Sequence, residues 1–269
     1  MSGRGEPPAT TAALHGPRWG VRAADWAELA AGISWPAWEA VADAAGVGEA
    51  TRVLDVACGS GEFCRLVASR GAIASGIDAS EGMIEVARRT ASNLDFRVGA
   101  MEHLPWEDGS FDVVTGFNAF QFAADFVAAL AEARRVVRPG GSVAICNWGR
   151  PEDNRLFDVL RPVRELQPPP AVPVSPDPPA TGEPGVLEGL ARQVGLDPVL
   201  SDEVDIPFEA GDDELLGRAL LAPGAVVAAV ERCGEEVVLQ AILAAAVPFR
   251  RADGSYRIDN RFRYVVCRG

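Results

Sequence analysis

The sequence has few of the residues that build metal and redox sites. It holds two histidines, His15 and His103, and five cysteines that are widely spaced and odd in number. No CxxC pair or histidine cluster has the spacing of metal ligands, so we predict no metal site. Reduced thiols in a cytoplasmic protein are the simplest account of such cysteines.

Several other features are missing. No apolar run reaches the ~18 residues expected of a membrane span, and residues 1–11 are polar and contain proline, unlike a secretory signal. No basic cluster with interleaved aromatic residues occurs, and a net charge of −13 at pH 7 repels a phosphate backbone. We therefore predict no membrane or nucleic-acid partner, and the sequence does not indicate an oligomeric state.

What the sequence does have is a strand–turn–helix signature at residues 53–63. Residues 53–56 read as a buried parallel strand, and Gly59 and Gly61 make a turn where a ligand can approach the backbone. The amide groups that begin the next helix favour an anionic ligand group. A dinucleotide site would need a third glycine where this chain has Cys64, which argues against a pyrophosphate.

Three segments, the first of them within this signature, support one family. The run D-x-x-C-G-x-G, ending at Gly61, resembles the first motif of class I S-adenosylmethionine-dependent methyltransferases. Asp78 lies 23 positions beyond Asp55, at the tip of the next predicted strand, where a carboxylate can accept both hydroxyls of a ribose. The structural alternative is an acid flanking the helix that Ser80 begins. Residues 99–105 resemble the family's adenine-facing segment, with Ala100 where the family commonly has aspartate.

The resemblance implies a Rossmann-like α/β fold. We expect a doubly wound, seven-stranded, mostly parallel sheet with helices on both faces, an N-terminal helical segment and a lid insertion after strand 5. We predict a flexible leader at residues 1–18, followed by one methyltransferase-like domain at 19–269. Within the domain we expect N-terminal helices at 19–48, a cofactor-binding core at 49–149, and the lid or substrate-side insertion with the last strands at 150–269. Nine prolines between Arg161 and Gly185 predict a semi-rigid connector, because proline disfavours both helix interiors and inner strands.

Local patterns predict the individual elements. Helices are expected at 25–31, 36–45, 61–70, 81–89, 124–137 and 185–194, with two or three more in 212–246. Strands are expected at 53–56, 72–78, 94–99, 111–117, 142–148, 200–208 and 262–267.

The cofactor implied by the resemblance is S-adenosylmethionine. Its predicted contacts come from the first motif, the end of the second strand and the helix after it, the adenine-facing segment, and the loop after the fourth strand. They are Asp55, Ala57, Gly59, Ser60, Gly61, Asp78, Ala79, Met83, Ala100, Met101, Glu102, Asn118 and Gln121.

The roles of four tryptophans and two histidines stay open. Trp19, Trp26, Trp35 and Trp38 either pack helices onto the sheet or close over the ligand. His103 is expected at the surface, and His15 can act only if the leader folds over the site.

The reaction implied is in-line transfer of a methyl group to a small, hydrophobic or aromatic molecule. No general base is identified, so the catalytic residues are unassigned. Two alternatives stay open: a methyltransferase-like protein that uses its bound cofactor for other chemistry such as cyclisation, and a non-catalytic ligand-sensing protein. The missing acid at Ala100 leaves room for the second.

Overall fold

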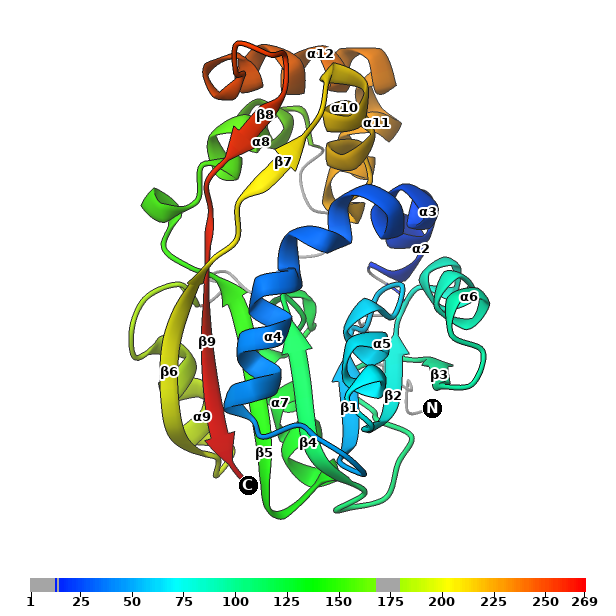
Figure 1. Ribbon diagram of the computed structural model, residues 1–269, viewed down its shortest axis with the longest axis vertical. Helices are drawn as coiled ribbons and strands as arrows, with labels where there is room; N and C mark the ends of the chain where they lie inside the picture. Colours follow the sequence, from blue (N-terminus) through cyan, green and yellow to red (C-terminus); the bar gives the residue numbers. More distant parts are fainter. Residues whose placement is uncertain (1–12, 14, 168–179) are drawn as a thin grey trace, which may run out of the picture.

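The computed structural model describes residues 13, 15–167 and 180–269, and one seven-stranded sheet lies at its centre (Figure 1). The strand order is β3-β2-β1-β4-β5-β9-β6, and among the described strands of this sheet β9 runs antiparallel to both neighbours. This confirms the predicted doubly wound, mostly parallel sheet. The strands are β1 (Arg52–Val56), β2 (Ile73–Asp78), β3 (Asp95–Val98), β4 (Phe111–Phe117), β5 (Val137–Trp148), β6 (Asp197–Asp205) and β9 (Arg261–Arg268).

Helices cover both faces of the sheet because the central strands are apolar on both sides. Val53 packs toward α5, whereas the next residue, Leu54, packs toward α7 on the opposite face. On the first face lie α4 (Trp35–Ala44), α5 (Glu62–Ser69) and α6 (Glu81–Thr90), and on the second lie α7 (Phe126–Val136) and α9 (Val186–Gln193). As predicted, Ser80 caps α6, its hydroxyl accepting the N–H of Met83.

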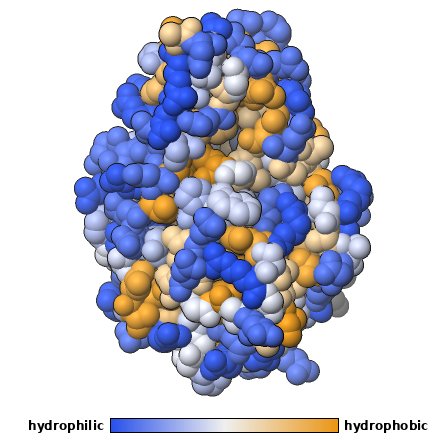
Figure 2. Space-filling model, in the orientation of Figure 1, coloured by the Kyte–Doolittle hydropathy of each residue, from blue (hydrophilic) through white to orange (hydrophobic). Residues whose placement is uncertain are grey.

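A helical cap stands beyond the end of the sheet and has a hydrophobic core of its own. It comprises α8 (Leu156–Leu166), α10 (Asp213–Leu221), α11 (Gly224–Cys233), α12 (Glu235–Ala246) and the hairpin of β7 (Phe208–Ala210) and β8 (Tyr256–Ile258). The prediction placed a lid insertion after strand 5, within residues 150–269. Of the described cap elements, α8 follows β5, and the others lie between β6 and β9. In Figure 2, hydrophobic side chains reach the surface between the cap and the sheet.

The chain begins with a helical N-terminal segment, residues 15–34, between the cap and α6 (Figure 1). It contains α2 (Gly16–Gly20), α3 (Ala23–Asp25), a π-helical turn and a 3-10 turn. Of the predicted flexible leader, residues 1–12 and 14 lie outside the described part, and residues 16–18 belong to α2. The approach of α2 to α6 is close, since a Cβ at Gly82 would lie 2.9 Å from the Cα of Gly20.

Two local predictions were wrong. Pro162 lies inside α8, where the buried Val159 and Val163 of the cap core hold the helix despite the missing N–H. Residues 168–179 of the predicted connector lie outside the described part. Helix α7 ends at Val136, next to its predicted end, but β5 begins at Val137 rather than at the predicted residue 142, and the N–H of Gly140 donates to the carbonyl of Gly269 at 2.9 Å. Within the described residues, no helix has the length and apolar composition needed to cross a bilayer.

Gly61 should be the least replaceable glycine of the turn after β1. Its φ is +84°, and a Cβ there would lie 2.7 Å from the Phe96 ring, whereas Gly185, at φ +87°, has nothing within 4 Å of that position. Both alanine variants incur about 1–2 kcal/mol of left-handed strain, and Gly61→Ala adds roughly 1–3 kcal/mol of overpacking. Urea unfolding should therefore rank Gly61→Ala well below Gly185→Ala, and equal losses would contradict the packing role.

Candidate functional site

The turn after β1 brings backbone groups to the end of β2. Ala57 and Gly59 have φ values of +57° and +54°, so the chain reverses within a few residues before α5 begins. The N–H of Gly59 donates to Asp78 Oδ2 at 2.9 Å, and the N–H of Ser80 donates to Asp78 Oδ1 at 2.8 Å. Burial raises the pKa of the Asp78 carboxyl, and these amide hydrogen bonds oppose that rise. A carboxylate has about four acceptor sites, so this one can still accept a hydrogen bond from a ligand.

Asp55, at the end of β1, is the second buried acid of the site. It is 4% exposed and accepts a hydrogen bond from the Thr115 hydroxyl at 2.7 Å. Burial raises the pKa of Asp55 to about 8, the Thr115 hydrogen bond lowers it, and the nearby Asp78 and Glu62 raise it further. With this pKa the Asp55 carboxyl mostly keeps its proton near neutral pH, and a cation bound beside it would stabilise the carboxylate form.

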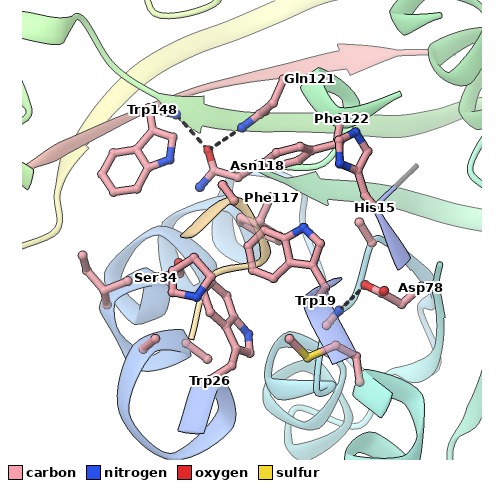
Figure 3. Close-up of a pocket in the computed structure, with 18 of the residues that line it drawn as sticks. His15, Trp19, Trp26, Ser34, Asp78, Phe117, Asn118, Gln121, Phe122 and Trp148 are labelled. Carbon is pink, nitrogen blue, oxygen red and sulfur yellow. Dashed lines mark hydrogen bonds between the residues drawn. The ribbon is translucent and has the colours of Figure 1, made fainter. Parts of the chain in front are cut away.

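The loop after β4 supplies amide groups from the other side (Figure 3). Asn118 has a φ of +48°, and its Oδ1 accepts the N–H of Trp148 at 3.0 Å and an amide hydrogen of Gln121 at 3.4 Å. The Oε1 atom of Gln121 is buried and has no hydrogen-bond partner in the structure. A buried acceptor without a donor costs free energy, so this atom favours a ligand that donates a hydrogen bond.

These groups meet in one cavity of about 460 Å³. Nine of the predicted contacts line it: Asp55, Ala57, Gly59, Asp78, Ala79, Met83, Met101, Asn118 and Gln121. The other four lie outside its lining. Ser60 is fully buried and donates its hydroxyl to Glu62, Gly61 packs on Phe96, Ala100 adjoins the lining residue Met101, and Glu102 accepts the N–H of Ala124.

The N-terminal segment forms part of the cavity wall. Trp19, Trp26 and Trp38 line the cavity, which agrees with the alternative that places tryptophans over the site. Trp35 is 46% exposed and does not line it. His15 also lines it, in edge contact with the Phe122 ring at 5.4 Å between centroids. Its position confirms that residues of the predicted leader reach the site.

The two histidines differ in environment. Burial lowers the pKa of His15, the charge of Arg18 lowers it further, and Glu102 opposes the shift. His103 is exposed, as predicted.

The cap supplies the remaining, mostly apolar wall. Trp148, at the end of β5, is followed by α8, which contributes Phe157, Leu160 and Arg164. These α8 residues were not predicted to line the site because the prolines nearby indicate a connector, although apolar residues recur at helical spacing from Leu156 to Val163.

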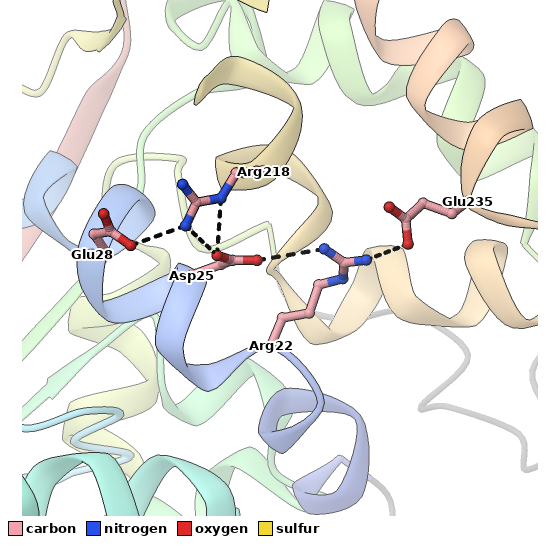
Figure 4. A network of polar contacts seen from close by, with 5 residues as sticks. All are labelled: Arg22, Asp25, Glu28, Arg218 and Glu235. Atoms are coloured by element: carbon pink, nitrogen blue, oxygen red, sulfur yellow. Dashed lines mark hydrogen bonds and ion pairs between the residues drawn. The ribbon is translucent and has the colours of Figure 1, made fainter. Parts of the chain in front are cut away.

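Ion pairs join the N-terminal segment to the cap (Figure 4). Asp25 lies between Arg218 of α10, at 2.7 Å, and Arg22, at 3.5 Å. Arg218 also contacts Glu28 at 2.9 Å, and Arg22 contacts Glu235 of α12. The wall formed by residues 15–34 is thus tied to the cap by charges and to the sheet side by α6.

Comparison with known proteins agrees with this geometry. Residues 54–145 match the family model of a methyltransferase domain. Demethylmenaquinone methyltransferase from Renibacterium salmoninarum is 37% identical over 111 residues, 41% of this chain and 47% of that protein. The chain spans between 36% and 58% of the length of the curated relatives it matches.

Solved structures share the fold. A putative methyltransferase from Bacillus halodurans C-125 superposes with a TM-score of 0.57 at 17% identity, covering 86% of this chain and 97% of that one. The [4+2]-cyclase SpnF superposes with a TM-score of 0.54 at 20% identity, covering 86% of this chain and 80% of that one. The family model and the curated relatives cover part of the chain, and over residues 54–145 they support a class I S-adenosylmethionine-dependent methyltransferase domain.

The cavity has groups that fit this cofactor. S-adenosylmethionine has a ribose diol, a cationic ammonium and sulfonium, and a flat adenine. The Asp78 carboxylate can accept hydrogen bonds from the diol, and a cation bound beside Asp55 would stabilise the carboxylate form of that buried acid. The unpaired Oε1 of Gln121 suits an N–H donor, and the side chains of Met83 and Met101 offer apolar surface to a ring.

Replacing Asp55 with asparagine should change how stability depends on pH. The folded pKa, about 8, lies above the unfolded value near 3.8. Between these values the unfolded chain releases a proton that the folded chain keeps, so this carboxyl's contribution to stability is lost as pH rises from about 4 to about 8. The asparagine side chain has no proton to lose and can still accept from Thr115. The free energy of unfolding of Asp55→Asn relative to wild type should rise by at least about 1 kcal/mol between pH 5 and pH 9. Urea titrations test this, with the exposed Asp95→Asn as control, and parallel pH profiles for Asp55→Asn and wild type would contradict it.

Removing Arg218 should loosen the N-terminal segment more than the whole fold. Exposed ion pairs contribute about 0–1 kcal/mol each, so Arg218→Met should lower the free energy of unfolding only slightly. Hydrogen exchange of residues 23–30 should accelerate several-fold, because Asp25 and Glu28 lose their partner on α10. Arg257→Met, which removes pairs with Glu209 and Asp259 at the hairpin, is the matched control. Unchanged exchange in this segment would show that apolar packing alone holds it.

Proposed function

We propose that the protein transfers a methyl group from S-adenosylmethionine to a small hydrophobic or aromatic molecule. One observation supports this above the others: the glycine turn and strand-end acids border the same cavity as the apolar wall of the cap. A cofactor half and an acceptor half that share one space can bring two reactants together and hold them in orientation.

The proposed cofactor contacts follow the chemistry of each residue. Asp78 accepts the ribose hydroxyls, and Ala79, Met83 and Met101 surround the adenine. Asp55, Ala57, Gly59, Asn118 and Gln121 surround the methionine half. Ser60 and Gly61 shape the turn, and Ala100 and Glu102 support the adenine side from outside the lining.

The cofactor supplies a methyl group on a sulfonium, which is already a good leaving group. The residues of this chain then have to bind, align and exclude water. Trp19 and Trp26 cover the turn, and the Cβ position of Gly59 lies 3.4 Å from the indole nitrogen of Trp26. His15 lies near the proposed adenine end of the cavity, because the Cβ position of its neighbour Gly16 lies 2.4 Å from the carbonyl oxygen of Ala79. This places His15 away from the proposed methyl group, so we do not assign it as a general base.

We therefore assign no general base, and infer an acceptor that ionises readily or is already nucleophilic.

A second candidate function keeps the cofactor and changes the chemistry. The cap side of the described cavity wall is apolar apart from Arg164 and Gln167, an environment that can direct a cyclisation or rearrangement by shape. The mass of the product separates the two functions, since methyl transfer adds one carbon unit to the acceptor and cyclisation adds none.

We further propose a cytoplasmic location and a small-molecule partner, with no nucleic acid. Four of the five cysteines, Cys58, Cys64, Cys146 and Cys267, are buried free thiols. Burial raises the pKa of each, which keeps them as neutral thiols.

Calorimetric titration of S-adenosylhomocysteine tests the cofactor site. Wild-type protein should bind it one to one, and Asp78→Ala should weaken binding at least about thirtyfold, since hydrogen bonds to a charged group contribute roughly 1.5–3 kcal/mol. Asp78→Asn keeps one acceptor and should fall between them, while Asp95→Asn should match wild type. Far-ultraviolet circular dichroism confirms folding of each variant. No binding to folded wild-type protein, or equal binding by Asp78→Ala, would refute the proposed site.

A further inference from the structure

The cap half of the cavity has a row of aromatic rings that ends in a cation. The rings of Phe262 and Trp148 lie 4.8 Å apart between centroids, and those of Trp148 and Phe157 lie 5.2 Å apart. The guanidinium carbon of Arg164 lies 5.1 Å from the centroid of Phe157. All four residues line the cavity, so one wall runs from apolar rings to a positive charge.

Arg164 belongs to the cavity face of α8. Phe157, Leu160 and Arg164 follow one another at spacings of three and four residues, which places them on one side of a helix. Arg161, in contrast, does not line the cavity and is paired with Asp158. Among the described residues no acid pairs with Arg164, whose side-chain contact is the Phe157 ring.

The charges of the cavity are separated by element. The acids that line it, Asp55, Glu62 and Asp78, belong to the ends of β1 and β2 and the start of α5. Arg164 belongs to the last turn of α8, in the cap. The acids thus lie on the strand-end side of the cavity, and on the cap side Arg164 is an exposed cation with no acidic partner among the described residues.

A guanidinium selects its partner by shape as well as by charge. Its planar fork matches a carboxylate through two parallel hydrogen bonds, and it is weakly hydrated enough to lie on an aromatic face. Among the described lining residues Arg164 is the one cationic side chain whose charge does not depend on pH. One such charge balances a monoanion, whereas a phosphate monoester carries close to two.

We propose that the acceptor is an amphipathic monocarboxylate, whose apolar or aromatic body lies along Phe262, Trp148 and Phe157 and whose carboxylate pairs with Arg164. This rests on the proposed function, because it assigns the other half of the same cavity. It also fixes the orientation of the acceptor in the cavity. The carboxylate lies at the cap end, away from Gly59 and Asp78, so it is an anchor and a different atom of the molecule receives the methyl group.

A matched pair of probes tests the anchor. Calorimetry with 6-phenylhexanoate and the neutral 6-phenylhexan-1-ol, each with and without saturating S-adenosylhomocysteine, should give at least about tenfold tighter binding of the acid, the equivalent of 1.4 kcal/mol. Arg164→Met keeps the apolar stem and should remove that preference while leaving the affinity for the alcohol within about twofold. Arg161→Met, on the outer side of the same helix, should behave as wild type.

The outcomes separate this inference from the proposed function. Equal binding of acid and alcohol by wild type, no saturable binding of the acid, or equal weakening of both probes in Arg164→Met would each overturn the carboxylate anchor. Tighter binding of 6-phenylhexyl phosphate than of 6-phenylhexanoate would overturn the proposal that the acceptor is a monoanion. Normal binding of S-adenosylhomocysteine alongside any of these results leaves the cofactor half intact, whereas its failure in wild type refutes the proposed function itself.

Discussion

The arrangement of the site depends on one hydrogen bond between neighbouring strand ends, from the N–H of Gly59 to the carboxylate of Asp78. β1 and β2 pair in parallel up to Val56 and Ile77, and this contact joins the turn after β1 to Asp78, the last residue of β2. It holds the glycine turn in place and orients the carboxylate before any ligand binds. The cost is the burial of Asp78 beside Asp55, and the raised pKa values of both acids express that cost.

Two elements far apart in sequence then cover this edge of the sheet. The N-terminal segment lies over the turn through Trp19 and Trp26, and the cap faces it through α8 and α11. Apolar contacts fix the segment against α6, and ion pairs around Asp25 join it to α10 and α12. Since charges on the surface are weakened by salt and packed side chains are not, the two attachments respond differently to solution conditions.

Sequence patterns predicted the strands and the capped helix around the glycine turn well because their determinants are local. A strand, a glycine turn and a capped helix within thirty residues define the ends of β1 and β2, and the apolar run 111–117 coincides with β4. The acceptor half was not predictable in this way. Trp148 and Phe262 meet only because β5 and β9 pair antiparallel in that register. Pro162 in α8 shows tertiary packing overriding a local preference.

The position of His15 shows a similar limit of local patterns. Its neighbourhood in sequence is rich in glycine and proline, so nothing near it indicates burial. It becomes part of the wall because α2 contacts both α6 and α11, and because Gly16 allows a close approach to the backbone of Ala79. Contacts of that kind depend on the completed fold.

The separate core of the cap has a consequence for how such a protein changes over generations. Its side chains, from Leu156 through Ile258, form a hydrophobic cluster separate from those of the sheet. The family match, correspondingly, ends at residue 145, before the cap begins. A cap with a hydrophobic core of its own can vary in sequence with less effect on the packing of the sheet than substitutions within the sheet itself.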